Sequence, residues 1–116
     1  MKKNLQIKIL SVLTSDLIKT KYKNKSKHYG YCYIVSEAAY HLYAKEKGFS
    51  PYVAKDCYGL THWWLQNNKN EIIDIVAHAY YDDGEEPPYK NGRKTAFLTK
   101  QPSKRCKIIL ERIKNV

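Results

Sequence analysis

The stretch that restricts the fold most is THWWLQNNKNEIIDIV, residues 61–76. It contains two runs, Thr61–Gln66 and Glu71–Val76, that are rich in the aromatic and β-branched residues favoured in strands. Between the runs lies Asn67–Asn70, a cluster of residues that favour tight turns. Strands joined by so short a connection pair with each other in an antiparallel sense, so the stretch predicts a β-hairpin.

The register of this hairpin decides which of its side chains share a face. If the loop is Asn67–Lys69, Gln66 faces Asn70 and His62 faces Asp74. Facing residues have Cβ atoms roughly 4.5–5.5 Å apart, and a carboxylate within an apolar run needs a partner if it is buried. We therefore expect His62 and Asp74 to pair. A loop one residue different would put them on opposite faces, and the alternative for Asp74 is a position facing solvent.

Helices are expected on both sides of the hairpin. Val35, Ala38, Ala39 and Leu42 follow the i, i+3, i+4, i+7 spacing of one buried helical face, and Gly48 is a natural end for that helix. The predicted helices cover about 4–20, with a possible break at 14–16, about 31–46, and about 102–114. Further strands are predicted at Pro51–Lys55 and Thr95–Leu98. Residues 19–29 form a lysine-rich connection, and 77–95 are expected to be largely irregular.

These elements predict one α+β domain over 1–116, with a small antiparallel sheet packed against helices. The 116 residues carry a net charge of +10, which favours acidic partners such as nucleic acid or an acidic protein. The three cysteines show no paired spacing, so neither a zinc site nor a disulfide framework is expected, and no cofactor is predicted. Lys8 interrupts the apolar N-terminal run, so we expect no signal peptide, no membrane contact and a cytoplasmic protein.

Cys32 is the strongest candidate for a reactive residue. It stands at the predicted start of the 31–46 helix, directly after GY in GYCY, and the amide groups at a helix N-terminus favour a thiolate. A nucleophilic thiol needs a base, and the base needs a group that orients it; His62 and Asp74 are positioned for these roles. Cys57, in the loop DCYG, is the rival nucleophile, whereas Cys106 lies on an apolar helical stripe and is expected in the core.

Other polar residues near these candidates have simpler interpretations. Glu37 and His41 are expected to form an i, i+4 pair on the helix surface. His78 follows the second strand of the hairpin and is a loop residue or a second base.

The order of these residues resembles the papain-like superfamily, including transglutaminase-like and NlpC/P60-like domains. The resemblance covers about 30–76 and is carried by GYCY with Cys32, THWWL with His62 and EIIDIV with Asp74. The whole chain, through GYCYxxSEAxYHL, THWWL and GRKxAFLTKQPSKR, also resembles small bacteriophage proteins, which implies a phage or prophage origin and a location in the host cytoplasm but brings no activity with it.

The papain-like resemblance implies a cysteine-dependent hydrolase or acyltransferase, of the protease, amidase, deamidase or transglutaminase-like kind. Cys32 would attack an amide carbonyl of a protein or peptide-like substrate, with His62 as base and Asp74 orienting it. The residues expected to contact the substrate are Tyr31, Tyr33, Ser36 and Trp64. The backbone N–H of Cys32 is a candidate oxyanion donor, and the upstream candidates are His28 and Tyr29.

A second hypothesis needs no catalysis. Arg93, Lys100, Lys104 and Arg105 surround the start of the last predicted helix and would bind an anion there. The protein would then be a basic binding module for nucleic acid or an acidic protein, or an inhibitor of a host system that keeps a papain-like scaffold without activity.

Overall fold

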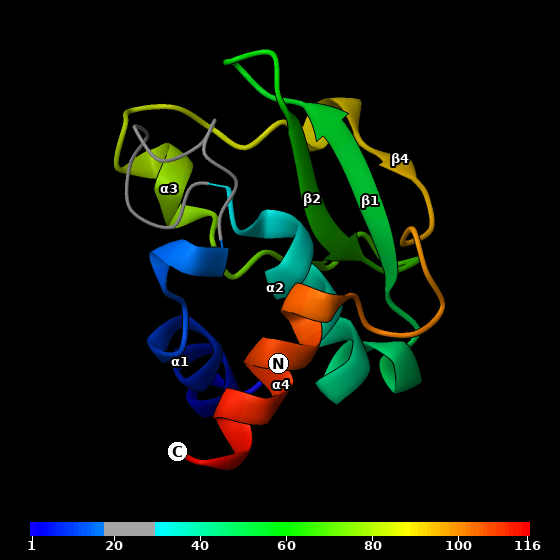
Figure 1. The fold of residues 1–116 in the computed structure, drawn as a ribbon. Helices are drawn as coiled ribbons and strands as arrows, with labels where there is room; N and C mark the ends of the chain where they lie inside the picture. The colour runs from blue at the N-terminus through cyan, green and yellow to red at the C-terminus, as the bar shows by residue number, and fades with distance from the viewer. Residues whose placement is uncertain (18–29) are drawn as a thin grey trace.

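A computed structural model describes residues 1–17 and 30–116. The lysine-rich connection predicted at 19–29, the last residues of the first predicted helix, and the candidates His28 and Tyr29 lie outside the described residues. A four-stranded antiparallel sheet has the order β3–β2–β1–β4 (Figure 1). The strands are β1 (Ser50–Lys55), β2 (Thr61–Gln66), β3 (Ile72–Ile73) and β4 (Arg93–Lys94).

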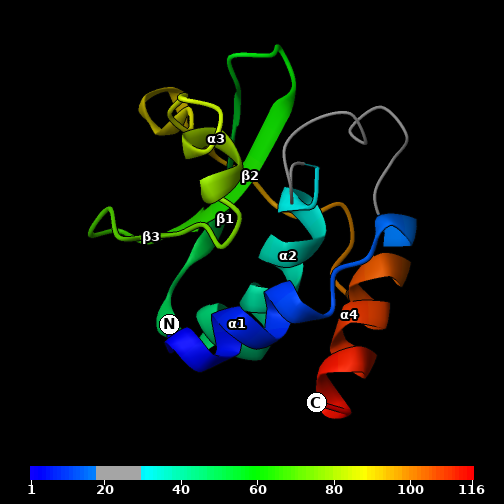
Figure 2. The ribbon, with the colours of Figure 1, turned by 90° about the vertical axis from the view of Figure 1, so that its left-hand side faces the viewer.

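Helices and helical turns lie on both faces of this sheet (Figure 2). The α-helices are α1 (Lys3–Ser11), α2 (Cys32–Ala39), α3 (His78–Tyr81) and α4 (Lys104–Lys114). Short 3-10 turns are η1 (Ser15–Leu17), η4 (Lys45–Lys47) and η5 (Tyr89–Asn91), and η3 (Tyr40–Ala44) is a π-helical turn. Helix α2 lies between the sheet and the pair α1 and α4, and it contacts β2, α1 and α4 (Figures 1 and 2). The predicted α+β class with a small antiparallel sheet is therefore confirmed.

The central position of α2 explains its composition. Val35, Ala38 and Ala39 are buried, as the helical spacing predicts, and the helical path runs on through η3 and η4 to Gly48, whose φ of 83° ends it. Leu42, which the same spacing places on the buried face, is 41% exposed. The π-turn of η3 accounts for the difference, because i→i+5 bonding inserts one residue and rotates the side chains that follow.

The predicted hairpin is present, with a different register. Leu65 faces Ile73 and Gln66 faces Ile72, where the sequence predicted Asn70 opposite Gln66. The loop is longer because the side chain of Asn67 organises it: Asn67 Oδ1 accepts hydrogen bonds from the N–H groups of Lys69 (3.0 Å) and Glu71 (2.9 Å). The second strand also ends at Ile73, three residues before the predicted end at Val76.

Other boundaries differ from the predicted ones. The first helix ends at Ser11, ahead of the predicted break, and a separate turn follows at η1. The last strand is Arg93–Lys94, not Thr95–Leu98, because it is residues 93 and 94 that pair with β1. Helix α4 begins at Lys104, since the side chain of Ser103 caps it by accepting from the Cys106 N–H (3.3 Å). Across residues 1–17 and 30–116, no helix is both long enough and apolar enough to cross a membrane.

Candidate active site

His62 and Asp74 form a buried pair. His62 Nε2 lies 2.6 Å from Asp74 Oδ2, and the two side chains are 1% and 3% exposed. The register differs from the predicted one by two residues, and an even shift keeps both side chains on the same face of the hairpin. Continuing the observed register places Trp64 opposite Asp74, so Asp74 reaches His62 from a diagonal position. Its backbone has already left the ladder, in a turn closed by the Ala77 N–H on the Asp74 carbonyl (3.2 Å).

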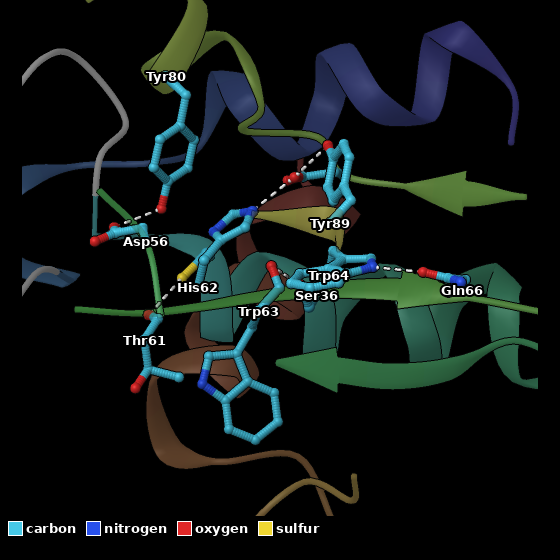
Figure 3. Close-up of polar contacts among 11 residues, drawn as sticks. Ser36, Asp56, Thr61, His62, Trp63, Trp64, Gln66, Tyr80 and Tyr89 are labelled. Carbon is cyan, nitrogen blue, oxygen red and sulfur yellow. Dashed lines mark hydrogen bonds and ion pairs between the residues drawn. The ribbon is translucent and has the colours of Figure 1, made fainter. Parts of the chain in front are cut away.

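The surroundings of His62 fix its orientation and its charge. Trp64 stacks on the imidazole with ring centroids 5.6 Å apart, and Tyr80 meets it edge-on at 4.8 Å (Figure 3). Burial alone would lower the pKa of His62. The hydrogen bond and negative charge of Asp74, together with the polar interaction and charge of Cys32, outweigh burial and raise the pKa to about 10. Since Nε2 is bound to Asp74, Nδ1 is the nitrogen left for Cys32.

Tyr89 joins the His62–Asp74 pair, and the sequence did not predict this. Its hydroxyl donates to Asp74 Oδ2 at 2.7 Å, so one carboxylate oxygen accepts from both Tyr89 and His62 (Figure 3). Burial and the neighbouring carboxylate raise the pKa of Tyr89, which keeps the phenol protonated as a donor. The ring of Tyr89 packs edge-on against Trp64 at 5.2 Å. Tyr89 comes from η5, and no periodic pattern in the sequence points to it.

Cys32 is the first residue of α2, as predicted, and its side chain is partly exposed. Its Sγ lies 3.9 Å from the carbonyl oxygen of Thr61, and one helical turn later Ser36 Oγ donates to the carbonyl of Trp63 at 3.3 Å. Four helical residues advance about 6 Å and two strand residues about 6.6 Å, so the two spacings match. Helix α2 thus lines the edge of β2 that β3, which pairs only with Leu65 and Gln66, leaves open.

This edge position gives Cys32 access to both faces of β2. His62 lies on one face. On the other is a pocket of about 400 Å³ whose walls include Cys32, Tyr33, Thr61, Trp63, Lys104 and Arg105. Tyr33 is held there by accepting a hydrogen bond from the Leu98 N–H (2.8 Å), and its ring meets Trp63 edge-on at 4.6 Å.

The predicted substrate-binding residues divide between this pocket and the protein interior. Tyr33 lines the pocket. Tyr31 is buried in the core, Ser36 docks α2 on β2, and Trp64 is buried beneath His62, so none of these three lines it. Trp63 takes the place that the sequence analysis gave to Trp64. Trp63 and Trp64 lie on opposite faces of β2, because side chains alternate along a strand. Which face carries the pocket beside Cys32 depends on how α2 docks on the sheet, and the sequence pattern does not indicate that docking.

The other cysteines differ from Cys32. Cys57 is exposed, and the pKa of its thiol is raised by desolvation and by the charges of Glu85 and Asp56. Cys106 is in the core as predicted, where burial and the charge of Glu37 raise its pKa to about 12. His78 begins α3 and does not line the Cys32 pocket.

The predicted anion-binding residues do not form one cluster. Lys104 and Arg105 line the Cys32 pocket, Lys100 lines a second depression with Tyr40 and His41, and Arg93 lines a third with Lys55. Among residues 1–17 and 30–116, no three His, Cys, Asp or Glu side chains gather closely enough to hold a metal ion.

Comparison with family models, curated proteins and solved structures found no match. The resemblance to papain-like domains, the phage origin and the cytoplasmic location therefore stay predictions.

Proposed function

We propose that this protein is a papain-like, cysteine-dependent hydrolase or acyltransferase that acts on amide bonds. The observation that carries the proposal is the buried His62–Asp74 pair at 2.6 Å, together with Cys32 at the start of α2, whose side chain contributes to the raised pKa of the imidazole. A buried ion pair stabilises a fold only weakly, because desolvation offsets much of the attraction. A protonated imidazole beside a partly exposed thiol, in contrast, stabilises the thiolate needed for nucleophilic attack.

The roles follow from the geometry. The Cys32 thiolate attacks the amide carbonyl carbon and a C–S bond forms. The tetrahedral intermediate collapses, the C–N bond breaks, and the imidazolium of His62 gives its proton to the departing amine. His62 then takes a proton from water or an acceptor amine, which attacks the thioester and releases the thiolate. Asp74 holds Nε2 throughout, so that Nδ1 faces the reacting atoms.

The N–H of Cys32 is the proposed donor to the oxyanion. Cys32 is the first residue of α2, and N–H groups in the first turn of a helix have no intrahelical acceptor. Gly30, with a φ of 93°, lines the same pocket and brings backbone without a side chain close to the thiol. An N–H donor aimed at a developing negative charge contributes about 3–4 kcal/mol in acyl-transfer enzymes.

The test is the rate at which iodoacetamide alkylates each cysteine in the native protein, read by mass spectrometry. Cys57 is the internal control, because it is exposed but has a raised pKa. Cys32 is expected to react at least about tenfold faster than Cys57 near pH 7, since its partner stabilises the thiolate. His62→Gln is expected to remove most of that advantage and leave the Cys57 rate unchanged.

Asp74→Asn gives an independent check, because it leaves the imidazole in place and removes the charge that holds it. It is expected to slow Cys32 alkylation by a smaller factor than His62→Gln. Circular dichroism shows whether each variant is folded. The catalytic proposal is wrong if Cys32 and Cys57 are alkylated at equal rates. It is also wrong if neither substitution changes the alkylation rate of Cys32 in folded protein. Either result would mean that Cys32 is a packing residue.

A further inference from the structure

The pocket beside Cys32 is positively charged. Lys104 is exposed and Arg105 half-buried, and both side chains line the pocket with the thiol. No aspartate or glutamate from residues 1–17 and 30–116 lines it, and neither cation has an ion-pair partner within those residues. The rest of the wall is mainly apolar and aromatic, with Tyr33, Trp63 and Leu98. A ligand that fills it would therefore place an anionic group near two unneutralised cations.

These cations are held in place relative to Cys32 by a buried contact. Glu37 is 0% exposed, and its carboxylate accepts from the Ser103 N–H (3.0 Å) and the Ser103 hydroxyl (2.5 Å). The expected surface pair of Glu37 with His41 is therefore wrong, because Glu37 points into the junction of α2 and α4. Glu37 is on the helix that begins with Cys32, and Ser103 directly precedes Lys104. This contact therefore fixes the positions of Lys104 and Arg105 relative to Cys32. Glu37 binds Ser103 and forms no ion pair with Lys104 or Arg105, so neither cation is used by this contact.

We infer that Lys104 and Arg105 form a carboxylate-binding subsite that selects amide substrates carrying an acidic group next to the reacting carbonyl, as an acidic residue in a peptide does. This inference rests on the proposed function. The planar guanidinium of Arg105 suits a carboxylate in a two-pronged hydrogen bond, and Lys104 adds a second charge. The aromatic wall of Tyr33 and Trp63 would pack on the aliphatic part of the side chain.

A peptide carboxylate fits this pocket better than a nucleic acid does. A volume of about 400 Å³ holds one or two side chains. Binding a phosphate chain needs a continuous basic groove, whereas Lys100 and Arg93 line two other depressions.

The experiment compares two alkylating reagents of similar size, neutral iodoacetamide and anionic iodoacetate, at Cys32. In both cases the thiolate displaces iodide as the S–C bond forms, so the ratio of the iodoacetate rate to the iodoacetamide rate reports the charge at the pocket. The double variant Lys104→Gln/Arg105→Gln is expected to lower this ratio about fivefold, and less at high salt. Lys107→Gln, on the exposed side of the same helix, is the matched control and is expected to leave the ratio unchanged. His62 is present in all these proteins, so its charge does not contribute to the difference.

A second arm tests the substrate class through protection of Cys32 from iodoacetamide. N-acetyl-glutamate amide at millimolar concentration is expected to protect the thiol, and N-acetyl-glutamine amide, its neutral isostere, is not. The double variant is expected to abolish the difference.

The outcomes separate this inference from the function on which it rests. Suppose that iodoacetamide alkylates Cys32 fast, but Lys104→Gln/Arg105→Gln does not change the ratio of the iodoacetate rate to the iodoacetamide rate. This result would overturn the carboxylate subsite and leave the catalytic proposal intact. Slow alkylation of Cys32 by both reagents would overturn both. Protection by a short single-stranded oligonucleotide at micromolar concentration, without protection by the glutamate compound, would overturn the carboxylate assignment in favour of a nucleic acid.

Discussion

Replacing Tyr89 by phenylalanine removes one hydroxyl and leaves the ring packed against Trp64, whose centroid lies 5.2 Å away. The hydroxyl donates to Asp74 Oδ2 at 2.7 Å, and the same oxygen accepts from His62 at 2.6 Å. A hydrogen bond to a charged acceptor contributes about 1.5–3 kcal/mol. Because Tyr89 is only half-buried and water can partly replace its hydroxyl, we expect a loss near the lower end, about 1.5 kcal/mol of unfolding free energy. For a chain of this length that corresponds to a fall in Tm of about 6 °C.

Tyr89→Phe is also expected to strengthen the interaction between Asp74 and His62, although it lowers the stability of the fold. Two donors share the charge of Asp74 Oδ2, so removing one leaves more negative charge facing His62 and raises the pKa of His62 further. The assays are urea unfolding at pH 7 and the pH titration of the imidazole followed by NMR. Tyr81→Phe is the matched control, because Tyr81 is 56% exposed and its hydroxyl has no hydrogen bond within residues 1–17 and 30–116. Unchanged stability in Tyr89→Phe, or a fall in the pKa of His62, would refute the shared-oxygen arrangement.

Substitutions at Gly92, Glu37 and Asp74 test the support of the site. Gly92→Ala places a Cβ 2.5 Å from Trp64 Cζ2, so the indole must shift; we expect a loss of about 1–3 kcal/mol in urea unfolding and slower alkylation of Cys32. Glu37→Ala leaves donors at the start of α4 unpaired and is expected to cost about 3 kcal/mol, whereas Glu37→Gln keeps an acceptor and costs about 1 kcal/mol. The pKa of His62 is raised from 6.5 to about 10, so its contribution to stability is complete below pH 6.5 and is lost as the pH rises towards 10. Asp74→Asn is expected to flatten this decline, measured as the unfolding free energy at pH 6, 8 and 10.

The hairpin and its buried pair could be predicted from the sequence because they depend on local patterns. The bounds of β2 match the prediction, and the pairing of His62 with Asp74 is present although the register is shifted. The shift did not matter because strand side chains repeat every two residues, so moving the partner by two keeps the face. The loop length was misjudged because the side-chain hydrogen bonds of Asn67 stabilise a wider turn than residue preferences alone indicate.

What the sequence could not predict depends on contacts between distant segments. Tyr89 and Asp74 are 15 positions apart in the sequence, with α3 between them, and Glu37 and Ser103 are 66 positions apart. Neither contact leaves a periodic pattern, and an isolated glutamate on a helix is usually exposed. Leu42 was misplaced for a related reason, since a π-turn changes the helical period and nothing in residue preferences indicates where one occurs.

The short length of β3 connects these features to the site. If β3 continued beyond Ile73, it would cover the edge of β2 at Trp63 and Thr61, where Ser36 and Cys32 now bind the carbonyl groups. A longer strand would also keep the Asp74 backbone in the ladder. Ending at Ile73 therefore has two consequences: it frees the edge for α2, and it lets the Asp74 carboxylate turn towards the imidazole. Cys32 and the Asp74 carboxylate therefore both owe their positions to the same break in the sheet.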